Sequence, residues 1–182
     1  MTFQADPNYY LQHAELIYSQ DAVNEAISNI ANQLNIEYAN KCPLVLCVMG
    51  GAVYFTGQLL SKLTFALELD YVQATRYLDN TSGGDIKWAV MPKDNVSNRA
   101  VLLIDDILDE GVTLKAVADK CFSKGAISVK IAVLLDKQLS KHKPISADFI
   151  GLTVSNRYVF GCGMDVYGWW RNLPAIYALK DI

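Results

Sequence analysis

The chain has 182 residues, a hydrophobic fraction of 52%, a charged fraction of 19% and a formal net charge of −3. This length predicts one domain, residues 1–182, and the composition excludes a disordered protein. The negative charge disfavours non-specific nucleic-acid binding, which needs a basic surface. No apolar run approaches the roughly 18 residues that cross a bilayer, so no membrane partner is expected.

The four cysteines contain no Cys-x-x-Cys pair, and only two histidines are present. A Cys/His zinc site is therefore not expected, and the thiols are expected to pack as small apolar groups. The first residues lack the basic start and apolar run of a secretory signal. We expect the reducing cytoplasm to be the compartment of the protein.

The first half of the chain predicts alternating helices and strands. Apolar residues at helical spacing predict a helix over residues 19–40 with a polar N-terminal cap. The continuous apolar run 44–49 predicts a buried strand, which ends at Gly50 and Gly51. These glycines can let the backbone approach a ligand or form a plain turn, and both interpretations stay open. A helix over residues 53–63 follows.

Residues 67–77 predict a third strand. The next residues, 78–85, are polar, glycine-rich and aperiodic, which is typical of a functional loop, and we expect this loop to act as a lid. A strand over residues 86–91 and a surface turn over residues 92–99 lead back into the sheet.

Residues 100–114 organise the rest of the prediction. Five apolar residues end at Asp105 and Asp106, and Gly111 and Thr113 then open an amphipathic segment. The pattern predicts a buried parallel strand that delivers a polar loop to the start of a helix over residues 113–124. Because open α/β sheets bind ligands at the carboxyl ends of their strands, this loop is a candidate site.

Further strands are predicted at residues 127–135, 149–154, 158–160 and 176–179. The alternation of strands and helices predicts an α/β fold with a doubly wound, mainly parallel sheet and helices on both faces. The small basic cluster of Lys137, Lys141 and Lys143 is expected to be a solvated loop rather than a phosphate track.

The loop after Asp106 has the features of an anion site. The backbone N–H groups of residues 109–113, at a helix N-terminus, can bind a phosphate, with the Thr113 hydroxyl as a further donor. Asp105 and Asp106 are expected to point to opposite sides of the extended chain. Carboxylates beside a phosphate call for a cation, and hard oxygen ligands favour Mg²⁺. The same residues could instead cap the helix and solvate a turn.

Residues 101–113 resemble the phosphoribosyl-diphosphate signature of the type I phosphoribosyltransferases, an apolar strand followed by two acids, two apolar residues and Asp-x-Gly-x-Thr. Three further segments resemble the hypoxanthine-guanine branch of that family, in the family's order. They are 135–137, similar to its purine-contacting Lys segment, 158–161, similar to its base-stacking strand, and 164–171, similar to its closing Asp and Arg. Residues 81–87 resemble the far arm of its catalytic lid.

The resemblance implies a small hood over the site and a Mg²⁺-dependent purine salvage reaction. The 5-phosphoribosyl group of phosphoribosyl diphosphate would be transferred to N9 of a 6-oxopurine, hypoxanthine or guanine, giving IMP or GMP and diphosphate. A homodimer or homotetramer is expected. The alternatives are another base preference, such as xanthine, and a non-catalytic regulator with the same fold that binds nucleic acid. A phosphate-binding hydrolase or kinase is disfavoured, because no Lys lies between Asp105 and Leu114 as in a Walker loop.

Carried over position by position, the resemblance assigns a role to each matching residue. The 5′-phosphate would lie on a loop made of Asp109, Glu110, Gly111, Val112 and Thr113. The ribose hydroxyls and Mg²⁺ would contact Asp105 and Asp106, and Asp165 would hold a Mg²⁺ on the diphosphate. The diphosphate would contact Gly50, Gly51, Arg76, Tyr77 and Arg171. The purine would contact Lys137, Tyr158, Val159 and Asp165, and Asp109 would be the general base or acid near N7.

The chain also departs from the family pattern. Where the family usually has a basic residue after its first core strand, this chain has Met49, Gly50 and Gly51, so backbone N–H groups would hold the diphosphate there. Arg76 is a candidate for the missing positive charge. Glu110 replaces a small residue beside the phosphate, and we expect its side chain to point away from that phosphate, because a facing anion would weaken binding.

Overall fold

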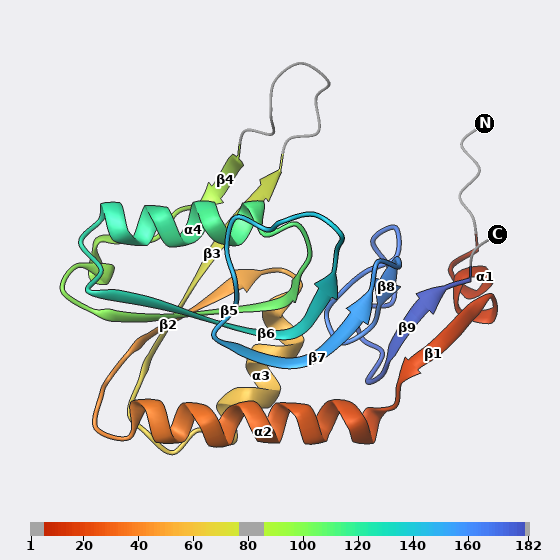
Figure 1. Cartoon of the computed structure of the whole chain (residues 1–182), viewed down its shortest axis with the longest axis horizontal. Coiled ribbons are helices and arrows are strands. Elements are labelled where there is room, and N and C mark those ends of the chain that lie inside the picture. Colours follow the sequence, from red (N-terminus) through yellow and green to blue (C-terminus); the bar gives the residue numbers. More distant parts are fainter. Residues whose placement is uncertain (1–5, 77–85, 181–182) are drawn as a thin grey trace.

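A six-stranded sheet forms the centre of the molecule, whose computed structural model describes residues 6–76 and 86–180. In the order in which they lie side by side, the strands are β4 (Ile86–Val90), β3 (Glu68–Arg76), β2 (Leu44–Met49), β5 (Ala100–Leu108), β6 (Ser128–Gln138) and β7 (Phe149–Ser155). Neighbouring strands run parallel except β3 and β4, which are antiparallel. The predicted mainly parallel sheet is therefore confirmed (Figure 1).

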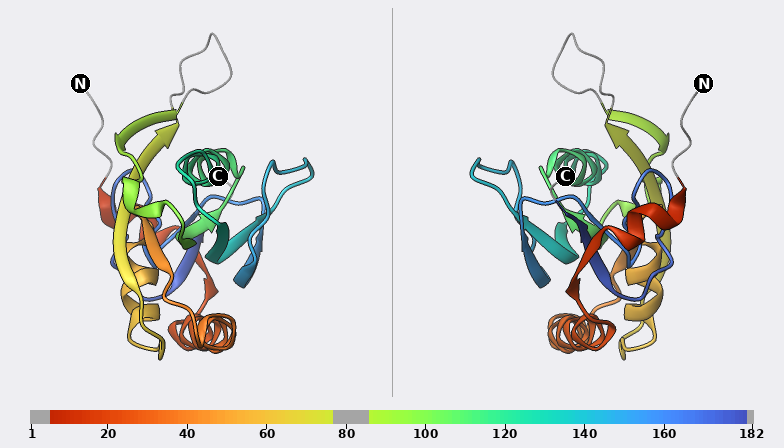
Figure 2. Two further views of the ribbon diagram at one scale, coloured as in Figure 1. Left: turned by 90° about the vertical axis from the view of Figure 1, so that its left-hand side faces the viewer. Right: turned by 90° about the vertical axis from the view of Figure 1, so that its right-hand side faces the viewer.

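Helices cover both faces of this sheet. α2 (Gln20–Tyr38) and α3 (Ala52–Leu60) pack on one face, and α4 (Val112–Ser123) packs on the other (Figure 1 and Figure 2). The side chains of β5 alternate between two cores: Leu102 and Ile104 pack with α2 and α3, and Val101 and Leu103 pack with α4. Because both faces are buried, successive positions are apolar. The doubly wound arrangement predicted from the sequence is confirmed.

The predicted helices are present, with small shifts at their ends. Ser19 caps α2, since the backbone N–H of Ala22 donates to the Ser19 hydroxyl at 3.3 Å. α4 begins at Val112 and not at Thr113, because Gly111 takes a left-handed φ of 79° and turns the chain into the helix. A short 3₁₀ turn, η1 (Asp94–Val96), lies in the predicted surface turn. Within the described ranges, no helix is both long and apolar enough to cross a membrane.

Two strands of the sheet extend further than the sequence predicts. The β5–β6 ladder continues to the pair Leu108 and Asp136, and the β6–β7 ladder continues to the pair Gln138 and Ser155. Polar residues can occupy these last strand pairs because the carboxyl ends of the strands face a cavity instead of a helix. Asp105, Asp106 and Lys137 therefore lie within strands, where backbone pairing holds them in place.

A second, three-stranded sheet lies beside the carboxyl ends of β6 and β7 (Figure 1). Its antiparallel strands are, in order, β1 (Ala14–Tyr18), β9 (Ile176–Leu179) and β8 (Val159–Phe160). We call α1 (Pro7–Gln12), β1 and residues 158–180 the hood. The sequence predicts β8 and β9 but not α1 or β1, because β1 owes its strand conformation to pairing with β9 at the far end of the chain.

The two faces of α2 provide a test of this packing. Ile30 is fully buried, whereas Ile36 on the same helix is 82% exposed. We expect Ile30→Ala to lower the free energy of unfolding by about 2–5 kcal/mol, through lost burial and the cavity left behind. Ile36→Ala should stay within about 0.5 kcal/mol of wild type. Equal midpoints for the two variants in urea unfolding would show that this face of α2 is wrongly assigned.

Candidate active site

A cavity of about 410 Å³ lies where β5 ends and α4 begins. Its walls come from the carboxyl ends of β2 and β5, the loop 109–113, the start of α4 and Arg171 of the hood. A second cavity of about 230 Å³ shares Asp106, Ile107 and Asp109 with the first one, and its other walls come from β6 and the hood. The two cavities therefore adjoin along the end of β5. Besides Asp106 and Asp109, the second one is lined by four further predicted site residues, Lys137, Tyr158, Val159 and Asp165.

Gly51 lies between Asp106 and the hood. The packing there is so close that position 51 has no room for a side chain. A Cβ atom on Gly51 would lie 1.9 Å from Oδ2 of Asp106, and one on Gly163 would lie 1.9 Å from the carbonyl oxygen of Gly51. The glycine in the turn thus lets three segments of the protein meet at the cavity wall. Gly50 has open space on its side-chain side, and the peptide bond that joins Met49 to Gly50 is cis.

Asp105 and Asp106 both line the first cavity, and their carboxyl groups contact each other, which contradicts the expectation that they point to opposite sides. Each carboxylate turns along the chain toward the next backbone N–H group. The N–H of Asp106 donates to Oδ1 of Asp105 at 2.9 Å, and the N–H of Ile107 donates to Oδ1 of Asp106 at 2.8 Å. These local hydrogen bonds override the simple alternation of an extended strand.

Removal from water raises the pKa of both carboxyls. For Asp105 the negative charge of Asp106 raises the pKa further, well above its ordinary value. For Asp106 the rise is opposed by its hydrogen bonds and by the positive charge of Arg171. Two adjacent acids with raised pKa values are stabilised in their ionised form by a nearby cation. The pair therefore fits a hard divalent cation such as Mg²⁺.

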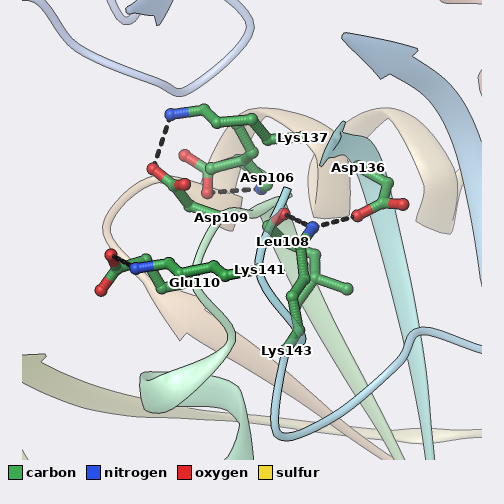
Figure 3. A network of polar contacts seen from close by, with 9 residues as sticks. Asp106, Leu108, Asp109, Glu110, Asp136, Lys137, Lys141 and Lys143 are labelled. Carbon is green, nitrogen blue, oxygen red and sulfur yellow. Dashed lines mark hydrogen bonds and ion pairs between the residues drawn. The ribbon is translucent and has the colours of Figure 1, made fainter. Parts of the chain in front are cut away.

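Lys137 and Asp109 form an ion pair at the junction of the two cavities. Nζ of Lys137 lies 2.6 Å from Oδ2 of Asp109, and the two residues come from neighbouring segments that the sequence separates by 28 positions (Figure 3). The Lys137 side chain is only 11% exposed. The residues predicted to contact the purine oxygen and to transfer its proton are thus brought together by the adjacent ends of β5 and β6.

The hood supplies a carboxylate, a guanidinium group and an aromatic ring. Arg171 pairs with Asp165 at 2.5 Å and donates to the carbonyl oxygen of Gly163 at 2.7 Å, while the N–H of Gly168 donates to Asp165 at 2.7 Å. The ring of Tyr158 is half exposed at the second cavity and lies nearly parallel to that of Tyr167, with centroids 6.1 Å apart. Tyr158 therefore presents an apolar surface next to the Lys137–Asp109 pair.

The sequence predicts that the basic cluster of Lys137, Lys141 and Lys143 is a solvated loop, but these lysines pair with groups of the protein. Lys141 pairs with Glu110, and Lys143 donates to the carbonyl oxygen of Leu108 at 2.8 Å and to Asp136 at 2.5 Å (Figure 3). The charges in the sequence do not reveal this contact, because they do not show that the segment folds back onto the loop 109–113. The signal available in the sequence was that three lysines follow the end of one predicted strand and several acids follow the end of the strand before it.

The roles predicted for Arg76 and Tyr77 remain untested. Arg76 is the last residue of β3, and its side chain, like Tyr77 and the predicted lid, lies outside what the structure describes. Among residues 6–76 and 86–180, no group of three or more His, Cys, Asp or Glu side chains is placed to hold a metal ion by itself. A cation at Asp105 and Asp106 would therefore take its other ligands from substrate and water, as Mg²⁺ commonly does.

Comparisons with known proteins find related sequences and a related fold. Residues 13–167 match the family model described as "Phosphoribosyl transferase domain". The chain is 35% identical over 167 residues to a hypoxanthine-guanine-xanthine phosphoribosyltransferase of Tritrichomonas foetus, with 91% of each protein covered. It is 36% identical over 167 residues to the bifunctional protein TilS/HprT of Listeria innocua, a match that covers 91% of this chain and 26% of that protein. A crystal structure of a hypoxanthine phosphoribosyltransferase from Staphylococcus aureus has a TM-score of 0.85 at 25% identity, covering 97% and 98% of the two chains.

The raised pKa of Asp105 predicts a pH-dependent stability. An acid whose pKa is higher in the folded protein stabilises the fold below its unfolded pKa of about 4, and that stability is lost as the pH rises through the folded pKa. In metal-free buffer, Asp105→Asn should therefore raise the thermal midpoint at pH 7, and the gain should shrink toward pH 4. Asp119→Asn, at a more exposed carboxyl of α4, is the control. A gain for Asp105→Asn that is equal at both pH values would contradict the assignment.

Proposed function

Because the chain belongs to the phosphoribosyltransferase family, we propose that it is a purine salvage enzyme of the hypoxanthine-guanine type. It transfers the 5-phosphoribosyl group of phosphoribosyl diphosphate to N9 of hypoxanthine or guanine, which yields IMP or GMP and diphosphate. The observation that carries this proposal is the Lys137–Asp109 pair at 2.6 Å, set between a helix N-terminus on one side and the Tyr158 ring on the other.

The sugar phosphate binds at the start of α4. Residues 109–113 line the larger cavity at the positive end of the helix dipole, where backbone N–H groups can donate to a phosphate and the Thr113 hydroxyl can add a donor. The diphosphate then lies toward the turn at Gly50 and Gly51, and Arg171 of the hood contacts it. Arg76 and Tyr77 remain predicted contributors from the end of β3 and the lid.

Asp105 and Asp106 hold the ribose hydroxyls and one Mg²⁺, and Asp165 serves a Mg²⁺ on the diphosphate. The chemistry of the donor set supports this assignment, because two confined carboxylates with raised pKa values favour a cation beside them. When bound, Mg²⁺ neutralises the negative charge of the departing diphosphate.

The purine stacks on Tyr158 in the smaller cavity, and the Val159 backbone contacts its edge. Lys137 donates a hydrogen bond to the 6-oxo group, and the Asp109 carboxylate takes the proton from N7 as N9 bonds to C1 of the ribose. The C1 centre passes through an oxocarbenium-like state, so that the main task of the protein is to position the base and to stabilise the leaving group. Both tasks use residues that already line the adjoining cavities.

Alternative assignments have weaker support. A regulator that binds nucleic acid would need a basic surface, whereas this chain has a net charge of −3. Xanthine is a further candidate base, since the name of the relative from Tritrichomonas foetus includes it. The cytoplasmic location, the homodimer or homotetramer and the one-domain organisation remain predictions.

A spectrophotometric assay tests the reaction. Hypoxanthine, guanine, xanthine and adenine are offered with phosphoribosyl diphosphate and Mg²⁺. We expect nucleotide from hypoxanthine and guanine, and a fall in kcat of about 10²–10⁴ for Asp109→Asn, which can no longer take up the proton. No nucleotide from any base would reject the enzyme assignment, and full activity of Asp109→Asn would reject the role of that carboxyl.

Lys137 can be tested separately through the base. Lys137→Met removes the donor to the 6-oxo group, so we expect KM for hypoxanthine to rise about 10-fold or more, with a much smaller change in KM for the ribosyl donor. Lys130→Met, on the same strand but paired with Glu37 of α2, is the matched control and should behave as wild type. Turnover of adenine but not of 6-oxopurines by the wild-type protein would reject this role.

A further inference from the structure

Tyr167 lies in a tight turn of the hood, at a position that disfavours its side chain. The backbones of Val166 and Trp169 exchange two hydrogen bonds of 3.0 Å, so that residues 167 and 168 form the middle of a two-residue hairpin turn. Both middle residues have a positive φ, 52° for Tyr167 and 91° for Gly168. Turns of this kind favour glycine and asparagine, and a bulky side chain there costs conformational energy. The tyrosine at this position therefore calls for a compensating contact of its ring.

The ring of Tyr167 makes such a contact with Tyr158, the tyrosine that we assign to the purine. The two rings lie within 15° of parallel with their centroids 6.1 Å apart, which is in the range of stacked aromatic pairs. Burial raises the pKa of Tyr158, and a hydrogen bond with the backbone of Tyr167 opposes that rise. Tyr158 lines the smaller cavity, whereas Tyr167 is not part of its wall. Tyr167 therefore contacts Tyr158 outside the cavity.

Helix α1 contacts the same turn. The ring of Tyr10 lies 5.0 Å from that of Tyr167, measured between centroids. Nε1 of Trp170, next to the turn, donates to the carbonyl oxygen of Pro7 at 2.6 Å. A row of three rings, Tyr10, Tyr167 and Tyr158, thus connects α1 with the smaller cavity.

Tyr158 needs support from its neighbours because its side chain is half exposed. A ring that is free to change its orientation loses that freedom when a base stacks on it, and the loss weakens binding. The stacked contact with Tyr167 restricts the Tyr158 ring before the base arrives, so that less freedom is lost on binding.

We propose, on the basis of the function proposed for the smaller cavity, that Tyr167 is a positioning residue for the purine: its ring holds the ring of Tyr158 in the orientation on which the base stacks. The effect falls on binding of the base, because the phosphate groups of the ribosyl donor are assigned to the larger cavity.

The test is a cycle of four proteins: wild type, Tyr167→Asn, Tyr158→Leu and the double variant. Asparagine suits a positive φ, so that Tyr167→Asn removes the ring and keeps the turn. We expect KM for hypoxanthine to rise about three- to tenfold in Tyr167→Asn, while KM for phosphoribosyl diphosphate changes less than about twofold. Tyr158→Leu should itself raise KM for hypoxanthine. In that background Tyr167→Asn should change it less than about twofold further, because Tyr167 acts through Tyr158.

Tyr177 provides a matched control within the hood. Its ring is stacked on that of Phe160, with centroids 5.7 Å apart and planes 23° from parallel, and neither residue is part of the wall of the smaller cavity. Tyr177→Leu removes a stacked ring from the same part of the protein and should leave KM for hypoxanthine unchanged. Tyr167→Phe keeps the ring and should retain the KM of wild type. An equal rise in Tyr177→Leu and Tyr167→Asn would indicate a general loosening of the hood and would overturn the proposal.

Two further outcomes would overturn it. A Tyr167→Asn variant with the KM of wild type for hypoxanthine would mean that the ring has no role in binding. A rise that persists in full in the Tyr158→Leu background would mean that Tyr167 contacts the base itself.

Calorimetry with IMP and with ribose 5-phosphate separates this proposal from the proposed reaction. Tyr167→Asn should weaken binding of IMP about three- to tenfold and leave binding of ribose 5-phosphate, which lacks the base, unchanged. A wild-type protein that forms no nucleotide but shows this pattern would reject the proposed reaction and retain the positioning role. Nucleotide formation by wild type, with an affinity for IMP that Tyr167→Asn does not alter, would do the reverse.

Discussion

The burial of β5 on both faces is the constraint on which the rest of the structure depends. β5 is hydrogen-bonded to β2 on one side and to β6 on the other, and residues 101–104 are fully buried between α4 and the layer of α2 and α3. A shift of register by one residue would exchange the side chains between two differently shaped cores. The carboxyl end of β5 is therefore a fixed platform for Asp105, Asp106 and the phosphate loop.

The acidic side chains at the carboxyl end of β5 fall into two groups. Asp105 and Asp106 lie against each other, and burial raises the pKa of both. A cation bound beside them would stabilise their ionised forms. Asp109, Glu110 and Asp136 instead pair with lysines of the protein, which lie at the end of β6 and in the segment that follows it (Figure 3). The net charge of the chain, −3, gives no hint of this local division.

The hood completes the site from a distant part of the chain. Its Gly163 packs against the backbone of Gly51, whose other side meets the carboxylate of Asp106, so that the hood, the turn after β2 and β5 meet at the cavity wall. Arg171 approaches Asp106 closely enough to oppose the rise of its pKa. The hood is thus a wall of the active site as well as a cover, and its small sheet depends on β1 from the opposite end of the chain.

The sequence by itself determined the sheet, its helices and the phosphate loop, because burial and helix capping leave their marks over short distances. The apolar run 100–104 and the pattern from Asp105 to Thr113 are local signals of this kind. They predicted the start of α4 to within one residue. Tertiary structure alone decided what depends on contacts between distant segments: the strand β1 and the contact of the Gly51 turn with the hood. It also decided the pairing of Lys141 with Glu110. Each of these follows from the geometry of packing between segments, which periodicity and composition do not encode.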